Sequence, residues 1–198
     1  MTPPVPIGLA AADFDLHATP WAGAVLIALA VAAGAADLRT GKVPNWLTLP
    51  AAAVGLLAHA LTGGISGGDG RLGLLGSLAG VGMGLVPLLL VWMVGGIGGG
   101  DVKLAGAIGA LGGWRFALAT LTYGIIAAVL MAVVIMVYKK LVRRTLRRVW
   151  HTLVLLVIPG ARPADPTGAD SPRIPFAVAL CVGAAGALAE LALRARAG

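Results

Sequence analysis

Long apolar stretches separated by short polar segments make up most of the chain. From their lengths and flanking residues we predict six helical segments, at about residues 21–36, 46–61, 72–94, 102–111, 114–138 and 175–193. An apolar helix needs about 20 residues to cross the hydrocarbon core of a bilayer, and most of these segments are close to that length. The pattern therefore predicts an all-α protein with about six transmembrane segments.

The fourth segment is too short to cross a bilayer. Its ten or so residues would rise roughly 15 Å as a helix, about half the hydrocarbon thickness. Backbone groups at the ends of such a helix cannot face lipid without hydrogen-bond partners. We therefore expect residues 102–111 to be surrounded by protein or to line a wet cavity, after an interruption at the glycine run Gly95–Gly100.

Glycines at four-residue spacing indicate close helix packing. Gly76, Gly80 and Gly84 recur along the third segment, and the last segment carries Gly183 and Gly186. Small residues at this spacing allow membrane helices to approach each other closely. Because membrane helices are rich in glycine in any case, these positions bear on architecture and not on chemistry.

Composition supports a membrane protein. Hydrophobic residues make up 59% of the 198 residues and charged residues 12%, against about 25% charged residues in a typical soluble domain. We expect one membrane domain over residues 21–198, preceded by a flexible leader over residues 1–20. That leader has no basic start, so no cleavable signal peptide is predicted. The net charge of +7 could indicate nucleic-acid binding, but the basic residues cluster between apolar segments, so no nucleic-acid partner is expected.

The distribution of basic residues predicts the orientation. With the N-terminus in the periplasm, residues 37–45, 95–103 and 139–173 form cytoplasmic loops that hold eleven of the fifteen Lys and Arg residues. This follows the positive-inside rule, and Trp21, Trp46, Trp92 and Trp114 fall at segment ends, as in an aromatic belt. Within the last loop, residues 139–150 have the pattern of an amphipathic helix on the cytoplasmic membrane surface, in contact with lipid.

Two aspartates in this apolar chain are the leading candidates for chemistry. Asp37 follows the first segment, Asp101 precedes the fourth, and the predicted topology places both at the cytoplasmic face. A carboxylate at a membrane edge is costly unless it is paired or hydrated, so it marks a functional site by default. Taken singly, Asp101 could be a helix N-cap and Asp37 a charge that ends a helix. As a pair they could share one proton and hydrolyse a peptide bond, one acting as general base and the other as general acid.

Several neighbours of the aspartates are candidates for support. The backbone of Gly98, Gly99 and Gly100 could approach a substrate strand closely, because these residues have no side chain. Lys103 either extends to the membrane interface or acts near the aspartates, and Asn45 either orients an aspartate or caps the second segment. The three histidines and the single Cys181 lack the spacing of metal ligands, so neither a metal nor a cofactor is expected.

Three segments resemble, in order, the motifs of the type IV prepilin peptidases. Asp37 with Lys42-Val43-Pro44-Asn45-Trp46-Leu47-Thr48 is similar to their first active-site segment, and Gly98-Gly99-Gly100-Asp101-Val102-Lys103-Leu104 to their GxGDxKL motif. Arg173-Ile174-Pro175-Phe176 is similar to the start of their last helix. The resemblance implies a GxGD aspartic protease of the bacterial cytoplasmic (inner) membrane, with Asp37 and Asp101 as its catalytic aspartates. Its substrate would be a prepilin, cleaved at the cytoplasmic face.

One difference from the bifunctional members of that family makes the expected activity more specific. Bifunctional members carry an N-terminal cytoplasmic segment with paired cysteines that is linked to methylation of the trimmed pilin, whereas Cys181 is the only cysteine here. The chain therefore resembles the short, peptidase-only branch that serves Flp-type (tight adherence) pili. We expect leader removal without N-methyltransferase activity.

The alternative is a small proton- or ion-coupled membrane transporter. Helices broken by glycine and carboxylates within a membrane also mark transport pathways. Against a transporter, the sequence shows no internal repeat, and both aspartates are predicted at one face instead of near the midplane. A peptidase is therefore the favoured prediction.

Overall fold

The structure is a computed structural model that describes residues 20–67, 71–138 and 175–197, and these residues form helices and short connections without β-strands. Within these described residues, five helical elements are assigned: α1 (Pro20–Thr40), α2 (Asn45–Gly63), α3 (Leu74–Met93), α4 (Gly99–Tyr138) and α6 (Phe176–Ala197). Each is long and apolar enough to cross a membrane. The predicted all-helical membrane class is thereby confirmed, while the number of spans and their orientation stay predictions.

The chain divides into two compact units. The first contains α1, α2, α3, the part of α4 up to Ala127, and α6, and the second begins at Ala128. Both aspartates lie in the first unit. The predicted loop at 139–173, the predicted amphipathic helix within it, and all of the predicted leader except Pro20 lie outside the described residues.

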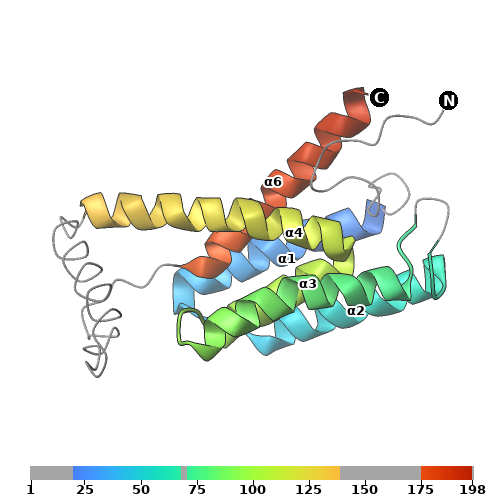
Figure 1. The fold of residues 1–198 in the computed structure, drawn as a ribbon, viewed down its shortest axis with the longest axis horizontal. Helices are drawn as coiled ribbons and strands as arrows, with labels where there is room; N and C mark the ends of the chain where they lie inside the picture. Colours follow the sequence, from blue (N-terminus) through green and yellow to red (C-terminus); the bar gives the residue numbers. More distant parts are fainter. Residues whose placement is uncertain (1–19, 68–70, 139–174, 198) are drawn as a thin grey trace, which may run out of the picture. The chain divides into compact units, whose positions relative to one another are not determined.

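Neighbouring helices of the first unit run in opposite directions. α1 packs against α6 and α2, and α2 packs against α3. As Figure 1 shows, α1 and α3 end at the same end of this unit at which α2 and α4 begin. The connections 41–44 and 94–98 therefore lie at one end, as expected for two loops on the same face.

The predicted fourth and fifth segments are the two helical parts of α4, which meet at a kink. α4 is continuous from Gly99 to Tyr138 except at Gly113, whose backbone (φ 77°, ψ 178°) is not helical. This break falls at the predicted boundary between the segments 102–111 and 114–138, so the division into two helical segments is confirmed. A single residue suffices for the break, since glycine adopts a positive φ at little cost.

The part of α4 that precedes this break is enclosed by protein. Every residue from Leu104 to Gly113 is buried, and the side chains of Leu104, Ala107, Ala110 and Leu111 have no exposed surface. The expectation that the short fourth segment is surrounded by protein is confirmed, although the helix starts three residues earlier than predicted.

Glycines on α2 and α3 let α4 approach at backbone distance. A Cβ on Gly80 would collide with the carbonyl of Gly109, and one on Gly84 with the carbonyl of Ala105. A Cβ on Gly55 of α2 would lie 2.9 Å from the carbonyl oxygen of Ala110. The predicted close packing is therefore seen at Gly80 and Gly84. Gly76 differs, because the nearest atoms to a Cβ there belong to the side chain of Leu72 and not to backbone.

Two polar side chains bond the carbonyl groups just before the break in α4. His59 Nε2 lies 2.9 Å from the Leu111 oxygen, and Ser77 Oγ donates to the Ala110 oxygen at 2.6 Å. Carbonyls in the last turn of a helix lack intrahelical partners, and a buried carbonyl without any partner is costly. His59 on α2 and Ser77 on α3 therefore complete the end of this buried half-helix.

Replacing His59 with alanine is expected to lower the free energy of unfolding by about 1–3 kcal/mol, because the Leu111 carbonyl would be left buried and unbonded. The matched variant His59→Gln keeps a donor and should lose less. The midpoint of thermal unfolding in detergent measures both. Equal losses in the two variants would show that the hydrogen bond contributes little.

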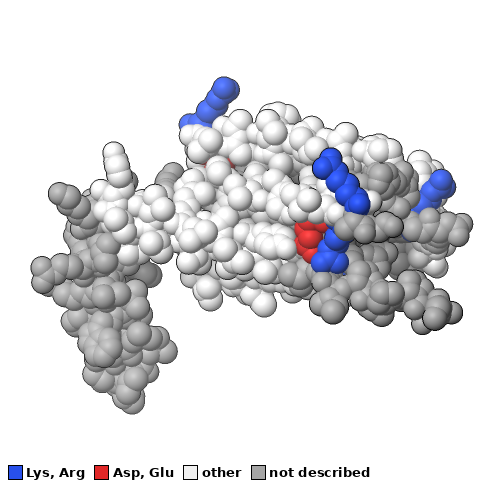
Figure 2. Space-filling model, turned by 90° about the horizontal axis from the view of Figure 1, so that it is seen from above, with Lys and Arg blue, Asp and Glu red and all other residues white. Residues whose placement is uncertain are grey.

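The outer surfaces of the helices are apolar. Large hydrophobic side chains such as Val31, Leu61 and Leu90 are more than half exposed. On the face seen in Figure 2, the described surface is almost entirely uncharged, with few basic side chains and one acidic patch. Such a surface suits lipid and is unlike that of a typical soluble protein.

Candidate active site

Asp37 lies in the last turn of α1. The predicted segment 21–36 placed Asp37 just beyond the end of the helix. In the structure α1 continues to Thr40, so Asp37 lies inside the helix. Its side chain is only 8% exposed. Among the described residues, Oδ2 of Asp37 is buried without a hydrogen-bond partner. A buried carboxylate oxygen without a partner is costly, so it points to a proton, a water molecule or a substrate group as its partner.

The end of α1 is shaped by local capping. Gly41 has a positive φ of 65°, and its N–H donates to the carbonyl of Asp37 at 2.8 Å. A left-handed glycine just past the last turn is a common way to end a helix. Thr40 Oγ1 adds a 2.8 Å hydrogen bond to the carbonyl of Ala36. The connection 41–44 therefore leaves α1 in a defined direction, four residues after Asp37.

Asp101 lies in the first turn of α4. Its backbone N–H donates to the Gly98 carbonyl at 3.1 Å, and its Oδ2 accepts a hydrogen bond from the Gly98 N–H at 3.3 Å. A carboxylate at the third helical position that reaches back to the N-cap N–H is one half of a capping box. Asp101 is thus not the N-cap itself, which was the alternative prediction, and it remains partly exposed.

The structure brings the two aspartates together. Asp37 is close enough to Asp101 for their charges to interact. Val43, in the connection that follows the turn of Asp37, also packs against Gly100 in the turn of Asp101. Residues 64 positions apart in the sequence thus meet at the end of the unit where α1 ends and α4 begins (Figure 1).

The three candidate glycines have different surroundings. A Cβ on Gly98 would lie 3.2 Å from Asp101 Oδ2, and one on Gly99 would lie 3.5 Å from Trp92 Nε1, an ordinary contact. A Cβ on Gly100 would lie 2.9 Å from the Val43 oxygen and 3.2 Å from the Val43 nitrogen. Gly100 therefore faces the chain's own backbone in the direction in which a side chain would point.

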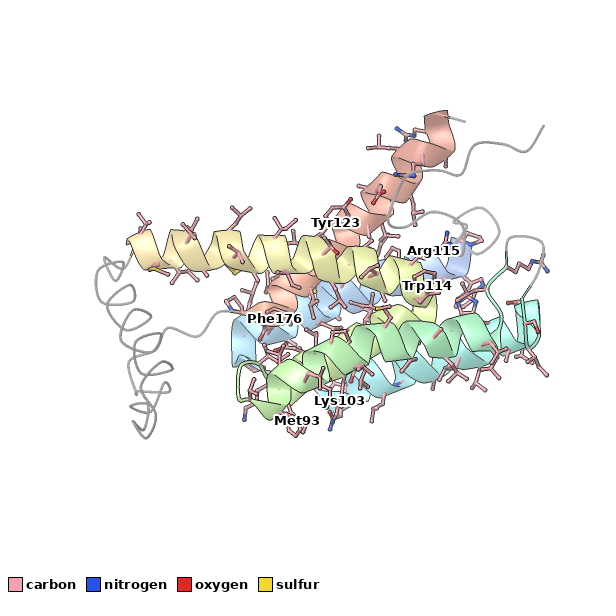
Figure 3. All side chains as sticks on the ribbon, viewed as in Figure 1. Met93, Lys103, Trp114, Arg115, Tyr123 and Phe176 are labelled. Atoms are coloured by element: carbon pink, nitrogen blue, oxygen red, sulfur yellow. The ribbon has the colours of Figure 1, made fainter. Side chains whose placement is uncertain are left out.

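Lys103 and Asn45 are bonded to each other. Lys103 Nζ donates to Asn45 Oδ1 at 2.9 Å, which joins α4 to the start of α2. Asn45 does not cap α2 with its side chain, because Pro44 occupies the N-cap position and no side-chain cap bond is present there. Figure 3 shows Lys103 and Met93 at one end of the first unit, with Trp114 and Arg115 toward the other.

Two neighbours of the aspartates were not singled out from the sequence for the site. Val43 is buried against the first turn of α4, and the only signal for it was its place before Pro44. Cys181 on α6 donates a hydrogen bond to the Ala30 carbonyl at 3.0 Å, and the charges of both aspartates act on it. Nothing in the sequence around Cys181 indicated this proximity.

The arrangement offers acid–base chemistry. Two carboxylates on separate helices lie close enough for their charges to interact, Asp37 buried and Asp101 partly exposed. Two adjacent carboxylates cannot both ionise cheaply, so such a pair tends to share a proton. One member can then take a proton from water while the other donates one. In the described ranges no group of three His, Cys, Asp or Glu residues could hold a metal ion.

Comparison with known proteins agrees with this chemistry. A family model described as the type IV leader peptidase family matches residues 24–135, which include both aspartates. Neither the curated proteins nor the solved structures compared with the chain include a match.

Proposed function

Because the chain belongs to the type IV leader peptidase family, and is thus a prepilin leader peptidase of the aspartic protease type, we propose that Asp37 and Asp101 are its catalytic pair. The family and the apolar helices make it a multi-pass membrane protein with a prepilin substrate. The observation that carries the proposal is the meeting of Asp37 and Asp101, the only carboxylates on α1 and α4.

The pair would hydrolyse the peptide bond without a covalent intermediate. The ionised carboxylate accepts a proton from a water molecule as the water oxygen attacks the scissile carbonyl carbon. The protonated carboxyl donates its proton to the carbonyl oxygen, which gives a neutral tetrahedral diol. Transfer of a proton to the peptide nitrogen then breaks the carbon–nitrogen bond and releases the leader and the mature N-terminus.

Leader removal in cells tests the catalytic pair. Co-expression with a Flp-type prepilin should give the shorter pilin on a gel with the wild type, and only the full-length prepilin with Asp37→Asn or Asp101→Asn. Glu190→Gln is the matched control. It makes the same carboxylate-to-amide change on α6. There Glu190 accepts a hydrogen bond from Tyr123 and forms an ion pair with Arg194. Glu190 lies about 14 residues, or about 21 Å, along α6 from the start of that helix. Cleavage by either aspartate variant would exclude the pair.

The proposal includes the location of the site. We place the protein in the bacterial inner membrane with the N-terminus in the periplasm and the aspartates at the cytoplasmic face. The excess of basic residues in the segments 37–45, 95–103 and 139–173 supports this orientation. A topology reporter fused after Arg148 should be active only in the cytoplasm, and periplasmic activity there would contradict the orientation.

The proposal also specifies a Flp-type pilin as the substrate and the absence of N-methyltransferase activity. The single cysteine of this sequence lies on α6, bonded to Ala30 of α1, and does not form part of a cysteine pair. We therefore expect a Flp-type pilin cleaved by this protein to carry a free, unmethylated N-terminus. Intact mass of the mature pilin measures this directly, because N-methylation would add about 14 Da. The added mass, or cleavage of only non-Flp prepilins, would overturn this part while leaving the peptidase activity intact.

The transporter alternative has no comparable support. The family match covers both aspartates and assigns leader peptidase activity, and both carboxylates lie at helix ends, whereas a transport site is usually near the middle of the helices.

A further inference from the structure

Two residues of the first turn of α4 contact the connection between α1 and α2. Gly100 and Lys103 are three positions apart, so they share one face of the helix. Gly100 packs on Val43, and Lys103 bonds Asn45. Asp101 lies between these two contacts in the sequence, about 100° around the helix from Gly100. Both contacts therefore act on the turn that carries this carboxylate.

The contact at Gly100 is made with backbone atoms. A Cβ there would lie 2.9 Å from the Val43 oxygen, 3.2 Å from its nitrogen and 3.2 Å from its Cβ. Backbone cannot move aside as the end of a flexible side chain can. Val43 is itself 7% exposed and belongs to the buried core of the unit. Any side chain at position 100 would thus push the first turn of α4 away from residues 41–44.

The other side of this contact is tied to Asp37. Residues 41–44 follow directly on the last turn of α1, and the N–H of Gly41 bonds the carbonyl of Asp37 itself. Asn45 then begins α2, where Lys103 reaches it at 2.9 Å. The segment 41–45 is therefore fixed to the turn that carries Asp37 and also touches the turn that carries Asp101.

We propose that Gly100, seated on Val43, and the Lys103–Asn45 hydrogen bond are positioning elements that set the separation of the two aspartates. Neither acts on the substrate: each acts through the placement of Asp101 relative to Asp37. This inference rests on the proposed catalytic pair. It assigns to Gly100 a role in assembling the pair, in place of the close approach to a substrate strand expected from the sequence.

The variant Gly100→Ala tests the packing contact between Gly100 and Val43. A displacement of about 1 Å at a catalytic group can cost about 10²-fold in rate, so kcat for prepilin cleavage should fall by one to two orders of magnitude with KM little changed. Gly106→Ala is the matched control on the same helix. The nearest atoms to a Cβ there are side-chain atoms of Leu85 and Val81 at 3.5 Å or more, so kcat should stay within about twofold.

The pH dependence of kcat separates positioning from general loss of stability. Two carboxylates that interact strongly titrate in two well-separated steps, and a larger separation weakens their interaction. The bell-shaped profile should therefore be narrower for Gly100→Ala than for the wild type. A profile of unchanged width with a lower kcat, and with a lower unfolding midpoint, would show a merely structural role and overturn the proposal.

The Lys103–Asn45 bond is tested by a double-mutant cycle that does not depend on the stability of the glycine variant. Lys103→Met and Asn45→Ala should each lower kcat several-fold, and the double variant should lose no more than either single one. Lys103→Arg keeps a donor within reach and should retain most of the activity. Additive losses, or equal losses for the Met and Arg variants, would refute the role of the bond.

The catalytic role of the aspartates and the positioning role of Gly100 and Lys103 can be refuted separately. If Asp37→Asn or Asp101→Asn still cleaves prepilin, the catalytic pair is wrong and the positioning role falls with it. If both aspartate variants are inactive but Gly100→Ala and Lys103→Met keep the kcat and the pH profile of the wild type, the pair stands and the positioning role alone is refuted.

Discussion

Replacing both aspartates at once is expected to reduce kcat for prepilin cleavage no further than replacing either one alone. Each single variant, Asp37→Asn or Asp101→Asn, should lose about 10³-fold or more. Groups that act as one unit show strongly non-additive losses, because removal of one already disables the shared proton transfer. An amide can neither accept the proton from water nor hold the proton that the pair shares.

Purified enzyme in detergent or nanodiscs, with a prepilin peptide as substrate, gives the three rate constants. Binding of uncleaved prepilin to the double variant controls for folding, since an inactive but folded enzyme should retain affinity for its substrate. Losses that multiply across the two sites would show that the aspartates act in separate steps. Residual activity near the wild-type level in one single variant would remove that aspartate from the chemistry.

Gly80→Leu is expected to abolish the native packing of α3 against α4. The glycines at positions 80 and 109 oppose each other, and a Cβ on either would collide with the carbonyl of the other. Because the obstacle is backbone, the side chain cannot be accommodated by a change of rotamer. We expect a loss of about 3 kcal/mol or more in the free energy of unfolding, at the upper end for overpacked sites.

Gly82→Leu is the matched control for this prediction. It lies two residues along the same helix, where a Cβ would meet nothing within 4 Å. The yield of monodisperse protein and the midpoint of thermal unfolding compare the two variants. If Gly80→Leu were as stable as Gly82→Leu, the two helices would not be in backbone contact.

The lengths and flanking residues of the apolar segments predicted the helices within a few residues. The predicted ends at Ala36 and Leu61 fell short by four and two residues, because polar residues such as Arg39 and Thr40 continue α1 until Gly41 ends it. The boundary between the fourth and fifth segments, predicted at residues 112–113, falls at Gly113. Composition did not show that the positive φ of this one glycine would be the whole break.

The aspartates could be found from the sequence because a charge in an apolar chain stands out, and because topology places both at one end. Their support was harder to predict. Lys103 and Asn45 were both candidates, but nothing in their spacing of 58 residues indicates that they bond to each other. Val43 carries no polar signal, so its contact with Gly100 became visible only when the two turns were seen together.

The enclosed half-helix before Gly113 has a consequence for how the protein is made. Its final carbonyls bond His59 and Ser77, and its backbone fits against Gly55, Gly80 and Gly84. All of these partners lie on α2 and α3, which are synthesised before α4. Since a chain folds from its N-terminal end during synthesis, both helices can already be in the bilayer when the half-helix emerges from the insertion machinery. Because α2 and α3 precede the half-helix in the sequence, it does not have to face lipid without its packing partners during synthesis. A permuted gene that encodes the half-helix before α2 would remove this advantage.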